Sequence, residues 1–116
     1  MSTIKVSNIR IASEAVSRPV TGVSAAWGGV TAAGSSTTPN LNISSIQDDG
    51  TGLTSFNFAA DLANTTYSVT TGLNSSTADA VAFGGISVSA IQLRSFNTSG
   101  ALANKTVCLS IHGELA

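Results

Sequence analysis

Three residues near the C-terminal end of the chain have side chains that could perform nucleophilic catalysis. Cys108, Ser110 and His112 alternate within an apolar run that is typical of a strand, from Thr106 to His112. Successive side chains of a strand point to opposite faces, so the three would share one face and the apolar residues between them the other. A thiol or hydroxyl beside an imidazole resembles a nucleophile with its base. The sequence supplies no orienting acid or oxyanion hole, so we expect an outer or inter-subunit face and no enzymatic activity.

Asp48-Asp49-Gly50-Thr51-Gly52 is the second chemically suggestive segment, because carboxylates and backbone carbonyls ligate calcium. The alternating acidic positions and the distant Glu of a helix-loop-helix calcium site are missing, and Asp-Gly between two alternating runs is typical of a hairpin turn. One Cys and one His are too few ligands for zinc. We therefore predict a hairpin here, and neither a metal site nor a cofactor.

Two aromatic side chains and one polar loop are candidates for recognition, because proteins bind sugars through exposed aromatic rings and amide or hydroxyl groups. Tyr67 lies inside a strand pattern and is predicted to belong to the core. Trp27 is followed by two glycines and fits either a core plug or a contact residue. The candidate receptor contacts are Trp27, Asn74, Ser75, Ser76 and Thr77.

Composition restricts the function classes. The 116 residues include 5 Lys and Arg against 6 Asp and Glu, a net charge of −1. A chain without a basic face lacks the main source of affinity for nucleic acid or for an anionic membrane. No apolar run is long enough to span a membrane, and the N-terminal residues lack the pattern of a signal peptide. We expect no nucleic-acid partner, no membrane insertion and synthesis in the cytoplasm of the cell that makes the protein.

The elements that must position these residues are predicted to be strands. Ser, Thr and Asn contribute 18, 14 and 8 residues, whereas charged residues make up 9% of the chain. Thr, Val, Ile and Phe favour strands, and the helix formers Glu and Lys are scarce. About seven short strands at this spacing predict an all-β fold, a small antiparallel β-sandwich. After a turn at Trp27-Gly28-Gly29 comes a short strand before Gly34, and the other predicted strands are 41–47, 53–59, 67–71, 80–83, 86–96 and 106–112.

Two of these strands are expected to be irregular. Gly84-Gly85 is predicted to end the strand that begins at Ala80. Between Ile86 and Phe96 the apolar alternation changes phase at Ala90, which predicts a bulge within a single strand.

The N-terminal quarter of the chain differs from the rest. Residues 1–25 contain apolar side chains that fit neither strict alternation nor one helical face, followed by a small, polar stretch around Arg18-Pro19. We predict an arm over 1–25 and a domain over 26–116. The candidate contacts of the arm are Ile4, Val6, Ile9 and Ile11.

Several segments resemble a recurrent small module of tailed-bacteriophage appendage proteins. Ala26-Trp27 is similar to the opening of that module, and the segment after Trp27 departs from its usual Asn-Phe-Asn-Gly-Thr-Gly run. The further segments that carry the resemblance are Met1 to Val6, Asn42 to Gly52, Phe56-Asn57-Phe58, Ala63 to Val69, Arg94 to Gly100 and Val107 to Gly113.

This resemblance implies a non-enzymatic virion protein, a homotrimeric tail fibre or tail-tip component that binds other virion proteins and has loops available to a host-surface glycan. With this resemblance, the arm over 1–25 is expected to join three chains or to attach them to a particle. A capsid-surface fibre or decoration protein is the first alternative. A free carbohydrate-binding module is the second, and a hydrolase built on Cys108, Ser110 and His112 is the last. The sequence leaves these alternatives open.

Overall fold

The computed structural model describes residues 3, 8–9, 18–19, 24–34, 40–74 and 77–116. These residues contain strands and no helix. The strands are β1 (Asn8–Ile9), β2 (Arg18–Pro19), β3 (Ser24–Val30), β4 (Ile43–Gly50), β5 (Leu53–Phe58), β6 (Ser68–Leu73), β7 (Ala80–Ile86), β8 (Ala90–Phe96) and β9 (Val107–His112).

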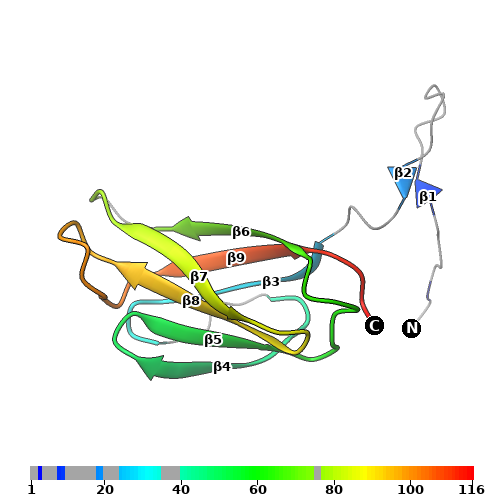
Figure 1. Ribbon diagram of the computed structural model, residues 1–116, viewed down its shortest axis with the longest axis horizontal. Helices are drawn as coiled ribbons and strands as arrows, with labels where there is room; N and C mark the ends of the chain where they lie inside the picture. The colour runs from blue at the N-terminus through cyan, green and yellow to red at the C-terminus, as the bar shows by residue number, and fades with distance from the viewer. Residues whose placement is uncertain (1–2, 4–7, 10–17, 20–23, 35–39, 75–76) are drawn as a thin grey trace.

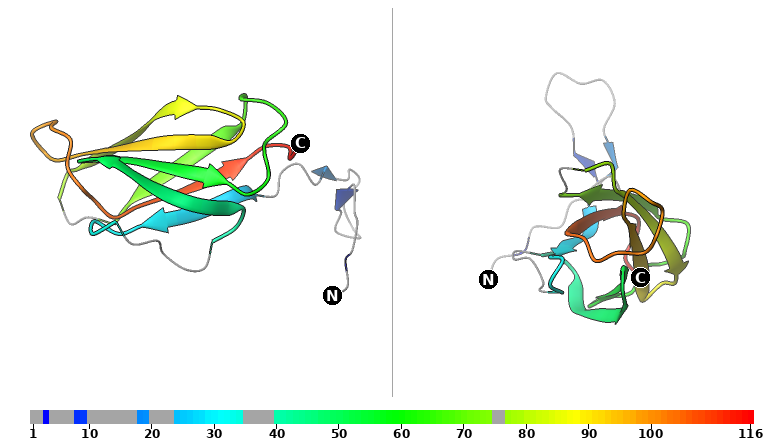
Figure 2. Two further views of the ribbon diagram at one scale, coloured as in Figure 1. Left: turned by 90° about the horizontal axis from the view of Figure 1, so that it is seen from below. Right: turned by 90° about the vertical axis from the view of Figure 1, so that its left-hand side faces the viewer.

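Seven of these strands form two antiparallel sheets that pack around one core (Figure 1). One sheet has the order β3-β9-β6 and the other the order β4-β5-β8-β7. The end-on view in Figure 2 shows the strands arranged around a common interior. The predicted all-β sandwich of about seven strands is confirmed. Strands β1 and β2 pair with each other, within the range predicted to be an arm.

The core is built from the inward faces of both sheets. In β9, Val107, Leu109 and Ile111 are buried, and Cys108 points outward, as the alternation predicted. Tyr67 packs against this core, which confirms its predicted place. The largest fully buried side chains are Phe56, Leu62, Ile91, Leu93 and Ile111.

The hairpin predicted around Asp-Gly is present as β4 and β5. Gly50 and Gly52 have φ angles of 136° and 70°, which are backbone conformations that favour glycine. The register shifts between Asp48 and Gly50, so Asp49 occupies a bulge just before the turn. The turn therefore begins after Gly50, three residues later than the pattern predicted.

The predicted boundaries around Gly84 and Gly85 are wrong. Strand β7 continues through both glycines to Ile86, and the register shifts between Phe83 and Ile86 as it pairs with β8. Ile86 to Phe96 is also not one bulged strand. A tight turn at Ser87 to Ser89 separates β7 from β8, and Ser87 N donates to Ala90 O at 3.0 Å. The phase change in the sequence marks this turn.

The turn predicted at Trp27-Gly28-Gly29 is wrong as well, because all three residues lie within β3. Gly28 lies where neighbouring residues pack closely against this strand. A Cβ on Gly28 would lie 3.3 Å from Cγ1 of Ile43 and 3.4 Å from Cβ of Asn40. Gly28 therefore marks the close approach of the next segment rather than a change of chain direction.

The chain enters and leaves the sandwich at one end, and three of the strand connections lie at the other end (Figure 1). Ser24 pairs with His112, so the chain enters and leaves the domain at one end, whereas Val30 pairs with Val107 at the other. The β4–β5, β6–β7 and β8–β9 connections lie at that second end (Figure 1). Of the predicted arm contacts, Ile4, Val6 and Ile11 lie outside the described residues, as does the side chain of Ile9.

Candidate functional site

The Cys108, Ser110 and His112 face does not form a nucleophile–base pair. All three residues alternate with buried ones and lie on the outer face of the three-stranded sheet, as predicted. Ser110 Oγ is 3.1 Å from Ser24 Oγ, and within the described part of the chain His112 makes no side-chain hydrogen bond to either potential nucleophile. A general base must lie within hydrogen-bond reach of the proton that it removes. Among the described residues, the hydrogen bond that would join a nucleophile on this face to His112 is therefore not formed.

The Asp48 to Gly52 segment is a hairpin turn, as predicted. Asp48 Oδ1 accepts a hydrogen bond from Gly50 N at 3.0 Å, a local turn interaction. The Asp49 carboxylate accepts from amide and hydroxyl donors. Within the described residues there is no group of three or more His, Cys, Asp or Glu side chains that could hold a metal ion.

Trp27 lies on the outer face of β3, at the edge of the three-stranded sheet. Its backbone pairs with Leu41 through hydrogen bonds of 3.1 and 2.9 Å, so the two side chains lie on one face of the sheet. Trp27 is 37% exposed and Leu41 43%. The core-plug alternative for Trp27 is therefore wrong, and its role as a receptor contact stays a prediction.

The candidate receptor loop lies at the far end of the sandwich from Ser24. Asn74 and Thr77 are exposed, and Ser75 and Ser76 lie outside the described residues. Asp79 accepts from Thr77 Oγ1 at 2.6 Å and forms an ion pair of 2.9 Å with Lys105. The structure does not bring this loop together with Trp27, which lies on the sheet face.

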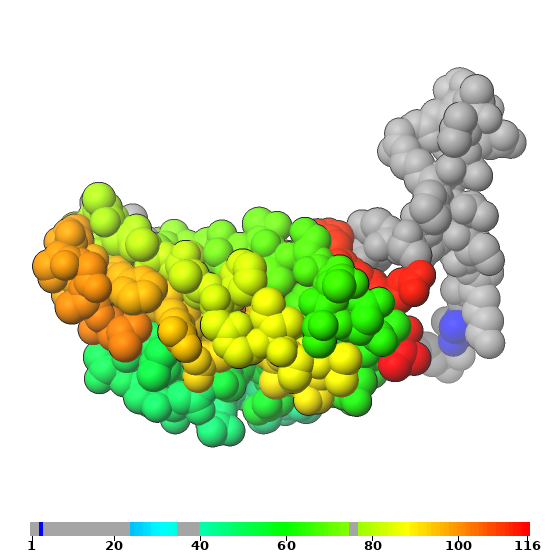
Figure 3. Space-filling view, viewed as in Figure 1, coloured from blue at the N-terminus to red at the C-terminus, as the bar shows by residue number. Residues whose placement is uncertain are grey.

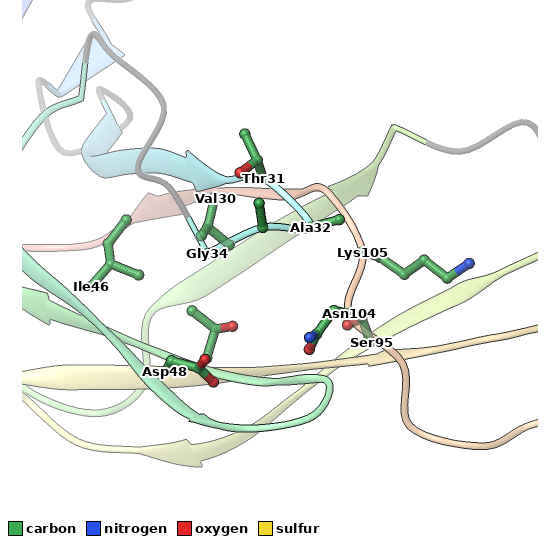
Figure 4. A pocket seen from close by; sticks show the side chains of 11 residues that line it. Val30, Thr31, Ala32, Gly34, Ile46, Asp48, Ser95, Asn104 and Lys105 are labelled. Carbon is green, nitrogen blue, oxygen red and sulfur yellow. The ribbon is translucent and has the colours of Figure 1, made fainter.

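A small cleft of about 180 Å³ opens between the two sheets at this same end (Figure 4). Its lining includes Asp48, Thr54, Asn104 and Lys105, and Lys105 extends away from Asp48 in the close-up. Asn104 Oδ1 accepts from Gly52 N at 2.8 Å, so this amide closes the end of the hairpin. Small-molecule pockets start at roughly 300 Å³. The cleft is smaller than that, so it carries no proposal for a small-molecule site.

The most organised polar cluster lies on the outer face of the four-stranded sheet. Asp49 in β4 accepts hydrogen bonds from side chains of three strands. Gln47 Nε2 donates to Asp49 Oδ1 at 2.8 Å, and Gln92 Nε2 donates to Oδ2 at 2.9 Å. Ser55 Oγ also donates to Oδ2. Gln47, Ser55 and Gln92 are direct cross-strand partners, so these side chains form one row across β4, β5 and β8.

These hydrogen bonds change the acidity of Asp49. They hold the pKa of the carboxyl below its ordinary value of 3.8, with Ser55 as the largest cause, then Gln92, and with a smaller opposing effect of burial. Donors that face a carboxylate stabilise its charged form. Asp49 is therefore ionised at neutral pH and fixes the orientation of both glutamine amides.

Arg94 adds a cation to the same face. It follows Gln92 by two residues in β8, so both side chains point outward. A Cβ built on Gly84 would lie 2.7 Å from Arg94 Nε and 3.1 Å from Cζ, which places the guanidinium directly over the Gly84 backbone. Within the described residues Arg94 has no ion pair.

We call the row Gln47, Asp49, Ser55 and Gln92 together with Arg94 the amide face. The surface of β4, β5, β7 and β8 covers the near side of the molecule in Figure 3. Asp49 lies in the segment that the sequence predicts as a hairpin turn, and the other four residues were not among the predicted site residues. Gln47 and Asp49 stand two residues apart, which is a usable signal. The partners in β5 and β8 depend on strand register.

No family model matches the chain, and no curated protein or solved structure is significantly similar to it. Among the described residues, none belongs to a helix long and apolar enough to cross a membrane.

Proposed function

We propose that the chain is a non-enzymatic structural component of a bacteriophage virion, a tail-fibre or tail-tip protein that assembles as a homotrimer and contacts the host surface. The resemblance of Asn42 to Gly52 and of the closing hairpin to appendage modules supports this proposal, as does the all-β sandwich. The virion is the corresponding location, and other virion proteins are the corresponding attachment partners.

The observation that carries the proposal is the lack of charge at two neighbouring sheet edges. Strands β6 and β7 are edge strands of their sheets and contain no charged residue. Phe83 and Ile86 in β7 are 46% and 39% exposed. Sheet proteins ordinarily protect such edges with Lys, Glu or Pro, because unpaired backbone groups template further pairing. Burial between subunits removes the same hazard.

The arrangement of the chain ends also supports attachment at one end of the domain. Ser24 and His112 lie side by side, so the first strand of the sandwich begins and its last strand ends at the same end of the domain. The connections at the opposite end are then directed away from the attachment point. We propose that the arm contacts Ile4, Val6, Ile9 and Ile11 join the chains.

Light scattering on the purified full chain tests the proposal. A chain of 11.6 kDa should give a trimer of about 35 kDa. Phe83→Lys should reduce this mass, because a charge buried against a neighbouring subunit is costly. Leu102→Lys is the matched control, since Leu102 is 41% exposed but lies in the β8–β9 connection. A monomeric full chain contradicts the trimeric appendage and favours a capsid decoration protein or a free carbohydrate-binding module.

Location on the particle separates the two virion alternatives. Labelled antibody or density at the tail supports the fibre, whereas density on the capsid shell supports a decoration protein. Absence from purified particles contradicts both.

A further inference from the structure

We propose that the amide face is a binding site for an acidic saccharide, one that carries a carboxylate or a phosphate group. This inference rests on the host-contact role proposed above and names its site and ligand class. Sugar rings are recognised by fixed amide and hydroxyl groups, and their acidic substituents by guanidinium groups. The amide face supplies both on one exposed surface.

The two glutamines are fixed by a carboxylate that can only accept. Each must therefore direct its Nε2 towards Asp49, which leaves the Oε1 of Gln47 and of Gln92 as acceptors for sugar hydroxyls. Asp49 accepts three hydrogen bonds and has about four lone-pair sites, so one site remains for a hydroxyl donor. Preoriented groups lose less entropy when a ligand binds.

A second fixed pair extends the surface along the strands. Asn57 Nδ2 donates to Ser45 Oγ at 3.0 Å, and these residues pair directly across β5 and β4. Their row adjoins the row of Gln47, Ser55 and Gln92 at the strand spacing of about 6.8 Å for two residues. The polar surface therefore offers several hydrogen-bonding groups both along the strands and across them. A sugar ring, which has several hydroxyl groups, can contact more than one of them.

Arg94 determines the preference for an acid. Its guanidinium rests on Gly84, where no side chain intervenes, and it has no carboxylate partner among the described residues. Lys105, by contrast, is already paired with Asp79. An exposed guanidinium that is positioned but unpaired forms bidentate hydrogen bonds with carboxylate or phosphate.

Neighbouring glycines in β7 provide a sharp test. Gly84→Ala would place a methyl group 2.7 Å from Arg94 Nε and displace the guanidinium without changing any charge. Because the displaced group is the end of a flexible side chain, the fold should be kept. Gly85→Ala is the matched control, since a Cβ there meets nothing within 4 Å. Arg94→Gln removes the charge directly.

The binding assay uses the full chain and three immobilised probes: oligogalacturonate, a glycerol-phosphate oligomer, and the neutral methyl ester of oligogalacturonate. The wild-type chain should bind at least one acidic probe and bind the ester at least about tenfold more weakly, the loss expected for one charge-assisted hydrogen bond. The two acidic probes distinguish a carboxylate from a phosphate ligand. Gly84→Ala and Arg94→Gln should weaken binding about tenfold, and Gly85→Ala should not.

Three results would overturn the inference: no binding to either acidic probe, equal binding to the ester, or equal behaviour of the two alanine variants. Thermal melts of each variant identify any that do not fold, and Arg94→Gln then serves in place of Gly84→Ala. Light scattering on the same samples separates the two proposals. A trimer without binding refutes the saccharide site alone, whereas a monomer that binds refutes the trimeric appendage alone.

Discussion

Replacing Asp49 by Asn should destabilise the domain at neutral pH and should have little effect in acid. The change keeps the shape of the side chain but removes its charge. Asp49 accepts hydrogen bonds from Gln47, Ser55 and Gln92, and an amide cannot accept from all three. Its NH₂ group must face at least one donor.

The size of the effect follows from exposure. A hydrogen bond to a charged group contributes about 1.5–3 kcal/mol when its partners are well shielded. Asp49 lies on the solvent side of the sheet, where water replaces much of what is lost. We therefore expect a total loss of about 1 kcal/mol, which corresponds to about 5 °C in Tm for a domain of this size.

The stability difference between wild type and Asp49→Asn should depend on pH. The folded-state pKa of Asp49 lies below its ordinary value of 3.8. A lowered pKa contributes stability that is fully present above the unfolded-state pKa and is lost as pH falls through the folded-state pKa. The difference between wild type and Asp49→Asn should thus be constant from pH 5 to 7 and shrink below pH 4.

Urea unfolding at several pH values measures this difference. Asp61→Asn is the control for loss of a negative charge, because the Asp61 side chain is exposed and accepts no hydrogen bond from the described residues. Its effect should stay within about 0.5 kcal/mol. A difference for Asp49→Asn that is absent at pH 7, or that persists unchanged at pH 2, would refute the assigned role of the carboxylate.

Two further substitutions test the packing of the sandwich. Gly52→Ala should lower the free energy of unfolding, measured with urea, by at least about 2 kcal/mol more than Gly100→Ala does. Both glycines have a positive φ angle, 70° at Gly52 and 81° at Gly100. Only at Gly52 would the new Cβ meet backbone, at 2.6 Å from Ser95 O. Equal losses would show that the β4–β5 turn can move. Tyr67→Phe should cost about 1 kcal/mol, since Tyr67 Oη donates to Ser87 O at 3.0 Å, and a thermal melt unchanged by the substitution would contradict this.

The local patterns of the sequence were sufficient where a strand or turn depends on its own residues. The alternation from Val107 to His112 places one set of side chains inside and the other outside, whatever the strand pairs with. Asp-Gly at the tip of two alternating runs likewise predicted the β4–β5 hairpin. Both follow from backbone sterics and from the period of two in a strand.

The predictions for glycines whose role depends on an adjacent strand or side chain were wrong. The residues around Gly28 predict a turn, yet Gly28 lies inside β3 and packs closely against Ile43. Gly84 appeared to end a strand, yet it provides the surface on which the Arg94 guanidinium rests. A glycine within a strand pattern indicates a position where a side chain would be unfavourable. Only the tertiary structure shows whether the cause is a positive φ angle or a steric clash with a neighbouring atom.

In the amide face, too, part of the arrangement follows from local sequence and part from the neighbouring strands. By itself the sequence determined that the chain is a β protein with little charge, and that Gln47 and Asp49 share a strand side if their run is extended. Tertiary structure alone decided that Ser55 and Gln92 join them, because cross-strand register is set by the packing of the buried faces and not by the polar residues themselves. Shifting one strand by a single residue would turn its outward side chains into the core, so the burial of Phe56 and Ile91 is what brings these polar groups together.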